Sequence, residues 1–276
     1  MSRSWDKRRS LEEALDFLPD SGFTLAFGGV TLYRRPMAAA LALLQSYTRT
    51  GTPTEITLMC ITAGPESDIL IQSGAISAVR TCYAGLEIFG LAPHFTQAVT
   101  NGSVHMIEET EASFAYGLRA ALAGVGFMPS TAWQGTDLLK LRPDVKSIKD
   151  PYSEEQLTAF PAMKPDVAII HALEADHEGN TVIGTNQGID RELALVADHV
   201  IVTCEKIVER LDHADIIGPV VDSVIEKPKG AWPTSCHPNY PLDGEAMLEY
   251  SEKSLTDDYA QLIKGWVEFH RLDKVS

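Results

Sequence analysis

The sequence has few cysteines, few basic residues and no long apolar run, and each shortage excludes a class of protein. Its four cysteines are scattered over 276 residues without a CxxC pair, which argues against a zinc ribbon, a redox motif or a dense disulfide framework. The 23 Lys and Arg residues face 38 Asp and Glu residues, and the net charge of −15 repels a phosphate backbone, so we expect no nucleic-acid partner. The longest apolar run, Met37 to Leu44, is well short of the roughly 18–20 residues that span a bilayer.

The N-terminal sequence does not have the pattern of a secretory signal. The first ten residues, MSRSWDKRRS, are basic, but the acidic LEEALDFL follows them in place of an apolar signal core. The composition, 45% hydrophobic and 22% charged, is that of an ordinary globular protein. We therefore expect a soluble cytoplasmic protein with reduced thiols and without membrane contact.

Helix and strand signals alternate along most of the chain. Ser10 and Glu13 form a capping box before a first expected helix, Pro36 opens another, and Gly74 closes a third. We expect helices at 10–18, 37–44, 67–73, 93–99, 111–123 and 191–197, and strands at 23–27, 56–61, 78–83, 104–107, 167–171 and 199–203. This β-α-β alternation predicts an α/β fold with a mostly parallel, buried sheet and helices on both of its faces.

Two long stretches interrupt the alternation. Met128 to Lys164 and Pro228 to Pro241 contain four prolines each, and we expect both to be irregular excursions, which in compact domains are usually functional or interfacial. The last part of the chain has spaced apolar residues that predict a helical tail at 244–272. Because we find no internal repeat, we expect a single domain over 1–276.

A glycine pair, Gly28 and Gly29, lies between an expected strand and an expected helix. Glycines at such a turn let the backbone approach a ligand closely, and exposed N–H groups there can bind an oxyanion or a phosphate. Taken alone, however, the pair is more simply explained as an ordinary strand-to-helix turn. It matches neither the dinucleotide-binding nor the P-loop glycine pattern, so nucleotide binding has no direct support.

An acidic cluster at 108–111, EETE, contains a second candidate. We expect Thr110 to be a helix N-cap, which puts Glu111 in the first helical turn. A carboxylate there complements the helix dipole by about 0.3–1 kcal/mol, and that alone could account for its presence. The cluster by itself therefore leaves a structural and a catalytic interpretation open.

Several histidines and acids invite a metal site, but their spacing does not support one. The segment DHEGN, which starts at Asp176, is typical of a tight turn in which Gly179 has positive φ, so His171 and its acidic neighbours are expected to be structural. Cys236 and His237 are adjacent, and adjacent side chains rarely point at each other. We expect no metal site and no Cys-His nucleophile.

A colinear series of segments resembles the α subunit of family I coenzyme A transferases, in the glutaconate CoA-transferase-like branch. The segments are LAFGGVTLYRRPMAAA at 25–40, SDILIQSGAISAV at 67–79, YAGLEIFGLAPHF at 83–95, EASFAYGLRAALAGVGFMP at 111–129, GTDL at 135–138, PAMKPDVAIIHALEADHEGN at 161–180, VIVTCEKIVE at 200–209 and GPVVDSVIEKPKGAWPTSC at 218–236. No single segment is decisive, but the ordered set is specific.

The resemblance implies an enzyme that moves CoA between an acyl-CoA and a carboxylic acid, with CoA as substrate and no other cofactor. In that family a glutamate attacks the thioester and forms an acyl-glutamyl anhydride, and the released CoA thiolate converts it to an enzyme–CoA thioester. Because that glutamate normally lies on the β subunit, this chain is expected to need a β partner, as an α2β2 heteromer. Gly28, Gly29 and Val30 are implied to line the acyl pocket with backbone donors.

The resemblance also makes Glu111 the candidate catalytic residue. In the ketoacid transferases the matching motif begins with a glutamine whose amide helps to hold the thioester oxyanion, whereas this chain has a carboxyl group in that place. An ionised carboxylate cannot donate a hydrogen bond. Glu111 is therefore expected either to donate as the neutral acid or to act as a general base.

Two other functions stay open. Bacterial steroid-ring-opening CoA hydrolases look similar here and keep a functional glutamate on the α chain, so an acyl-CoA hydrolase with Glu111 as base is one alternative. The other is a non-catalytic acyl-CoA-binding or scaffold protein that keeps the fold without the chemistry. The GTDL segment and the long excursion after Met128 favour the transferase.

Glu87 and three arginines complete the set of candidates. Glu87 lies in the family segment GLEIFGLAP, where comparable α chains also carry a glutamate beside a β-chain nucleophile, so a structural or interface role explains it better. CoA is a polyanion, and a chain with a net charge of −15 needs a locally basic mouth unless its partner supplies one. Arg34, Arg35 and Arg119 could contribute, although solvated surface positions are the default interpretation for each.

Overall fold

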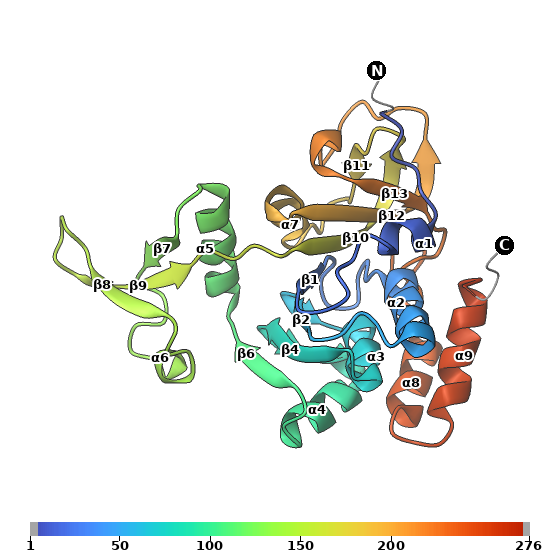
Figure 1. The fold of residues 1–276 in the computed structure, drawn as a ribbon, viewed down its shortest axis with the longest axis horizontal. Coiled ribbons are helices and arrows are strands. Elements are labelled where there is room, and N and C mark those ends of the chain that lie inside the picture. The colour runs from blue at the N-terminus through green and yellow to red at the C-terminus, as the bar shows by residue number, and fades with distance from the viewer. Residues whose placement is uncertain (1–4, 273–276) are drawn as a thin grey trace.

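A computed structural model describes residues 5–272, and an eight-stranded sheet forms its centre (Figure 1). In spatial order the strands are β13 (Ser223–Glu226), β12 (His199–Val208), β10 (Val167–Asp176), β1 (Thr24–Phe27), β2 (Ile56–Met59), β4 (Ile76–Thr81) and β6 (His105–Glu108), with β11 (Thr181–Val182) paired to β10. Only the β10–β11 pair is antiparallel in this sheet. The prediction of a mostly parallel sheet is confirmed.

Helices cover both faces of the sheet, as predicted. One face carries α1 (Leu11–Leu15), α2 (Met37–Thr50), α3 (Pro65–Ser73) and α4 (Pro93–Thr100), and the other carries α5 (Glu111–Leu122) and α7 (Asp190–Val196). The pleat of β1 explains this division, because Leu25 and Phe27 pack with the first group of helices while Ala26 lies on the opposite side. There Ala26 packs with Phe114 of α5 and Leu193 of α7.

The local signals in the sequence form as expected, but several boundaries differ. The capping box of Ser10 and Glu13 is present, and Gly74 closes α3 in the left-handed region with φ +87°. Helix α1 nevertheless stops at Leu15, whereas α2 continues to Thr50 and closes at Gly51. Element type was therefore more predictable than element length.

The stretch from Met128 to Lys164, which we expected to be irregular, contains a small antiparallel sheet. Its strands lie in the order β7 (Phe127–Ser130), β9 (Gln156–Pro161), β8 (Lys146–Lys149), and the connection between β7 and β8 includes α6 (Leu138–Leu141). We call residues 127–161 the arm, and Figure 1 shows it projecting from the main body. Pro129 lies in an edge strand, where a missing N–H is tolerated, and Pro161 is the last residue of β9, so proline did not exclude a sheet here.

The predicted helical tail is present as two helices, α8 (Gly244–Lys253) and α9 (Tyr259–Phe269). They lie at the opposite end of the molecule from the arm (Figure 1), where Met247 and Trp266 pack with Met37 and Leu41 of α2. Within residues 5–272, no helix is both long and apolar enough to cross a bilayer. That 1–276 forms a single domain stays a prediction.

Candidate active site

The two main sequence candidates lie at the same edge of the sheet. Strands β1 and β6 run in the same direction, so their carboxyl ends meet at one edge, where Gly28 follows β1 and Glu111 follows β6 by three residues. They are separated by the three steps β1–β2–β4–β6, which at about 4.8 Å a step is roughly 14 Å. The carboxyl edge of a parallel sheet is the usual place for a ligand site in open α/β folds.

The glycine turn is tightly packed against its own chain. Gly29 has φ +81°, and a Cβ atom there would lie 2.6 Å from the Tyr33 carbonyl oxygen. The Gly28 N–H donates to a carbonyl of β10, the Gly29 N–H to Asp190 Oδ1 at 2.8 Å, and the Val30 N–H to Tyr33 O at 3.1 Å. The three backbone donors are therefore occupied within the chain, contrary to our expectation that they face an acyl group. That these residues line the acyl pocket stays a prediction.

Two buried ion pairs contact the glycine turn. Arg34 Nη1 lies 2.9 Å from Asp190 Oδ2, and Arg35 pairs with Glu66, with all four side chains fully buried. Arg35 also donates to the Gly29 carbonyl at 2.9 Å, so both the N–H and the C=O of Gly29 are held by these pairs. The idea that Arg34 and Arg35 form a basic mouth on the surface is wrong, because both guanidinium groups are paired inside the fold.

Arg119, the third arginine of that expectation, is exposed on α5. It therefore keeps the position that a contributor to a basic surface needs. Whether it meets the negative charges of CoA stays a prediction.

Glu111 is the first residue of α5 and is exposed. Thr110 caps the helix as predicted, since its Oγ1 accepts the Ser113 N–H at 3.2 Å while Ser113 Oγ accepts the Thr110 N–H at 2.8 Å. Burial, helped by the nearby Glu111 carboxylate, raises the pKa of the Cys82 thiol to about 11. The Cys82 thiol, which follows β4, is therefore protonated at neutral pH.

Glu109 is a buried anchor that sequence reasoning did not identify. It is 2% exposed, and its Oε1 accepts hydrogen bonds from Arg80 at 2.8 Å and from Arg142 at 2.5 Å. Arg142 belongs to the arm and also donates to the Glu108 carbonyl at 2.8 Å. The sequence showed only an acidic cluster, because its basic partners lie 29 and 33 residues away.

Glu87 follows the carboxyl end of β4 and lies in a turn separate from the one that carries Glu111. It belongs to a short 3-10 helix, η1 (Glu87–Phe89), is exposed, and donates its N–H to Tyr83 Oη at 3.3 Å. The turn follows β5 (Tyr83–Ala84), which pairs with β3 (Thr62–Ala63). Since Thr31 donates to Thr62 Oγ1 at 2.8 Å, β3 connects the glycine turn to the segment that carries Glu87.

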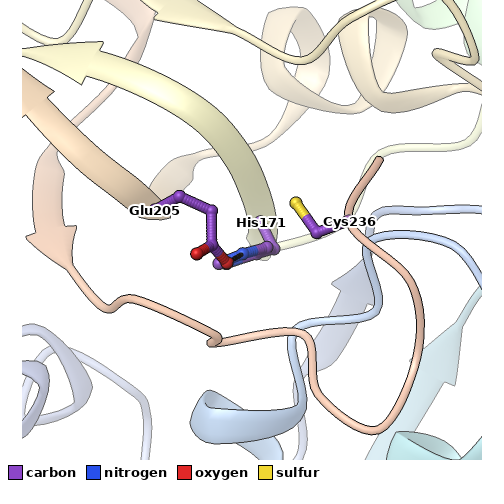
Figure 2. Close-up of side chains that lie close together, drawn as sticks. All are labelled: His171, Glu205 and Cys236. Carbon is purple, nitrogen blue, oxygen red and sulfur yellow. Dashed lines mark hydrogen bonds and ion pairs between the residues drawn. The ribbon is translucent and has the colours of Figure 1, made fainter. Parts of the chain in front are cut away.

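A third group of side chains gathers beside β10, as Figure 2 shows. His171 of β10, Glu205 of β12 and Cys236 of the 228–241 stretch offer ligand atoms that all lie within 4.8 Å of one another. The sequence predicts a structural role for His171 and argues against Cys236 as a partner of its neighbour His237. The structure instead places the Cys236 thiol near residues from two strands far away in the sequence.

The hydrogen bonds of this group favour a structural role, in which it holds the 228–241 stretch, over a metal-ion site. His171 Nε2 lies 2.7 Å from Glu205 Oε1 and its Nδ1 lies 2.9 Å from Thr203 Oγ1, so both ring nitrogens have protein partners. Glu205 also accepts the Tyr240 hydroxyl and a backbone N–H of the 228–241 stretch, each at 2.7 Å. Burial raises the pKa of the Cys236 thiol to about 12, so it is not a thiolate at neutral pH. The group joins the 228–241 stretch to the sheet.

The segment that starts at Asp176 is the tight turn that its sequence predicts. Asp176 Oδ1 accepts the N–H groups of Glu178 and Asn180, both at 3.0 Å, and Gly179 has φ +96°. Hydrogen bonding of the carboxylate to its own backbone is what makes Asp favourable in such turns.

Comparison with known proteins gives a consistent result. The model of the family described as coenzyme A transferase matches residues 8–227. The chain is 32% identical to the A subunit of glutaconate CoA-transferase from Acidaminococcus fermentans, over 95% of this chain and 88% of that protein. The crystal structure of that glutaconate CoA-transferase superposes with a TM-score of 0.87 at 29% identity, covering 98% of this chain and 93% of that one.

Two further relatives set the limits of this likeness. An uncharacterized protein of Archaeoglobus fulgidus is 33% identical over 93% of this chain, which spans only 58% of the length of that relative. The cholesterol ring-cleaving hydrolase IpdA subunit of Rhodococcus jostii is 28% identical, over 95% of this chain and 97% of that one. Similar chains thus carry names from both transferase and hydrolase chemistry.

Proposed function

This chain belongs to the coenzyme A transferase family, and on that premise we propose that it is the α subunit of a heteromeric CoA-transferase. The enzyme moves CoA from an acyl-CoA to a carboxylic acid. The observation that carries the proposal is the meeting of the glycine turn and Glu111 at one carboxyl edge, in a fold that superposes on glutaconate CoA-transferase.

The chemistry that we propose needs a carboxylate nucleophile on the partner. A glutamate of the β chain attacks the thioester carbonyl, CoA leaves as its thiolate, and an acyl-glutamyl anhydride remains. The thiolate then attacks the glutamyl carbonyl of the anhydride and releases the first carboxylate, which leaves a glutamyl-CoA thioester. A second carboxylate repeats these steps in reverse and leaves as the new acyl-CoA, so the kinetics are ping-pong.

The α chain supplies a wall of the cleft and one functional carboxyl group, that of Glu111. Its position suits contact with a substrate, because the residue is exposed while its two predecessors are anchored. Either of two roles is compatible with that position: donation to the thioester oxyanion as the neutral acid, or removal of a proton as a general base. In this proposal Gly28, Gly29 and Val30 line the acyl pocket beside β1, with their backbone N–H groups bonded within the chain.

The surface near Glu87 supports a heteromer. Its neighbours Ile88 and Leu91 are 90% and 69% exposed, and a partner that covers this turn would remove their apolar surface from water. We propose that the β subunit covers this turn and that Glu87 belongs to the interface. The assembly that we expect is α2β2, with acyl-CoA and a carboxylic acid as the small-molecule partners and with a cytoplasmic location.

A hydrolase that uses Glu111 as base is the second candidate, and the Rhodococcus jostii relative is the observation that favours it. The two reactions differ in the fate of the acyl group. A transferase keeps the thioester bond energy and needs an acceptor acid, whereas a hydrolase releases free CoA without one. The higher identity to the glutaconate CoA-transferase relative puts the transferase first.

The test uses this chain co-expressed with the β chain encoded beside it. We expect exchange of labelled CoA between acyl-CoA and a panel of carboxylic acids by the complex, and none by the α chain alone. Full turnover by the isolated α chain would contradict the proposal. Release of free CoA without an acceptor would establish the hydrolase, and acyl-CoA binding without exchange or release would establish a non-catalytic protein.

Glu111→Gln in the same complex separates the two roles of this residue. An amide still donates a hydrogen bond, so oxyanion donation predicts that much of the activity remains. Loss of a general base predicts a rate lower by about 10²–10⁴-fold. The matched control is Glu108→Gln, three residues earlier in the same acidic cluster.

A further inference from the structure

We infer that the arm positions the catalytic carboxyl group, with Trp133 and Arg142 as positioning residues for Glu111. The inference rests on the proposed function, since it gives the arm a purpose in that chemistry. The arm leaves the main body after α5 and returns before β10, so nothing in the topology requires it to touch the start of α5 again. Trp133 nevertheless contacts the N-cap residue of α5, and Arg142 contacts the two residues before that N-cap.

The first contact is made by Trp133. Its indole Nε1–H donates to Thr110 Oγ1 at 2.8 Å, and the same oxygen accepts the Ser113 N–H in the helix cap. The indole is 5% exposed and packs edge-on against Phe160 of the arm, with ring centroids 5.0 Å apart. Because the arm fixes the indole, the indole fixes the rotamer of the capping threonine.

The backbone of Trp133 supports this role. Its φ is +70°, in the left-handed region that a bulky residue rarely adopts and that costs on the order of 1 kcal/mol or more. Such a conformation persists where the surrounding contacts determine it. Here those contacts are the packing on Phe160 and the hydrogen bond to Thr110.

The second contact is made by Arg142. Its Nη1 donates to Glu109 Oε1 at 2.5 Å and to the Glu108 carbonyl at 2.8 Å, while Asp144 holds the other edge of the guanidinium at 2.7–2.8 Å. The arginine side chain is 6% exposed and that of Glu109 is fully buried. A charge-assisted pair of this kind has strong geometric preference, so it orients the end of β6 as well as stabilising it.

Together these contacts fix the residues on which the direction of Glu111 depends. The last sheet hydrogen bond on this side runs from the Glu109 N–H to the Thr81 carbonyl at 3.1 Å, after which the chain leaves β6. From there the arm holds the Glu109 side chain and the Thr110 side chain, and Glu111 follows as the exposed member. A displacement of about 1 Å at a catalytic group can reduce a rate by roughly 10²-fold.

The main experiment is Trp133→Phe in the αβ complex. Phenylalanine keeps an aromatic ring for packing on Phe160 but has no N–H to donate. We expect kcat for CoA transfer to fall by about ten- to a hundredfold with KM for acyl-CoA within about twofold, because positioning affects the reaction more than binding. The matched control is Gln134→Ala, which removes a hydrogen bond to Thr158 inside the arm and should leave kcat unchanged.

Two further readouts separate positioning from loss of structure and from loss of the proposed function. In a Glu111→Ala background, Trp133→Phe should reduce kcat by less than about twofold, because the group that it positions is absent. Equal losses in both backgrounds would overturn the inference. Amide hydrogen exchange of 109–114 should rise in Trp133→Phe relative to Gln134→Ala, and this can be measured even if the complex has no transferase activity. Unchanged exchange with unchanged kcat would also overturn it.

Discussion

The two halves of the candidate site are held in opposite ways. The glycine turn is fixed from inside, by Arg34 and Arg35 paired with carboxylates in full burial. The residues just before α5 are held by two side chains of the projecting arm, because Trp133 binds Thr110 and Arg142 binds Glu109. The first arrangement is part of the core, whereas the second depends on the contacts that the arm makes with the end of β6 and the N-cap of α5.

The largest effect should come from breaking the inner arrangement with Asp190→Ala. The change leaves the Arg34 guanidinium buried without its carboxylate and the Gly29 N–H without its acceptor, so we expect a loss of about 3–5 kcal/mol in the free energy of unfolding. Urea denaturation measures it. The control Asp198→Ala breaks the exposed Lys164–Asp198 pair and should cost no more than about 1 kcal/mol. Equal losses of unfolding free energy in Asp190→Ala and Asp198→Ala would mean that the buried pair stabilises the protein no more than the exposed pair does.

Gly29→Ala should have the next largest effect. The added Cβ would lie 2.6 Å from the Tyr33 carbonyl oxygen and 2.7 Å from that of Arg34, in addition to the left-handed φ, so we expect a loss of about 3 kcal/mol. Gly51→Ala is the matched control, because Gly51 has a similar φ of +77° but nothing within 4 Å of the added atom. It should cost about 1 kcal/mol. Thermal melts of both variants measure the difference.

Arg142→Met tests the outer arrangement and should cost less. Glu109 loses one partner but keeps Arg80 at 2.8 Å, so its buried charge stays paired and we expect a loss of about 2 kcal/mol. The loss should be local, with hydrogen exchange rising at 105–114 more than in the central strands. Lys140→Met, which breaks the exposed pair with Asp137 on the same arm, is the control and should change neither quantity measurably. A uniform rise in exchange would contradict the local interpretation.

The smallest effect concerns the Cys82 thiol. Burial is the main cause of its raised pKa and the Glu111 carboxylate adds to it, so Glu111→Gln should lower that pKa and increase the thiolate fraction. We expect alkylation by iodoacetamide to become about twofold faster at pH 8, with the rate still rising with pH beyond that point. Glu108→Gln is the control, because the neighbouring carboxylates that raise this pKa are those of Glu111 and Glu109. No change in Glu111→Gln would mean that the carboxylate is directed away from the thiol.

The sequence predicted the elements of the site better than their contacts. Thr110 as N-cap, Glu111 in the first helical turn and Gly28-Gly29 at a strand end were all expected and are all present. The arginines next to the turn were expected at the surface and are buried. The proline-rich stretch after Met128 was expected to be irregular and contains a small sheet, in which Pro129 lies in an edge strand and Pro161 ends the central strand.

Sequence alone determined the alternation of strands and helices, the caps and the tight turns, because periodicity and capping act between residues only a few positions apart. The tertiary structure alone decided which charges are buried and which backbone donors are occupied. Arg34 meets Asp190 across 156 positions, and Trp133 meets Thr110 across 23. A buried charge is stable only where the fold brings a partner of opposite charge next to it, and a local sequence pattern does not show which distant residue that partner is.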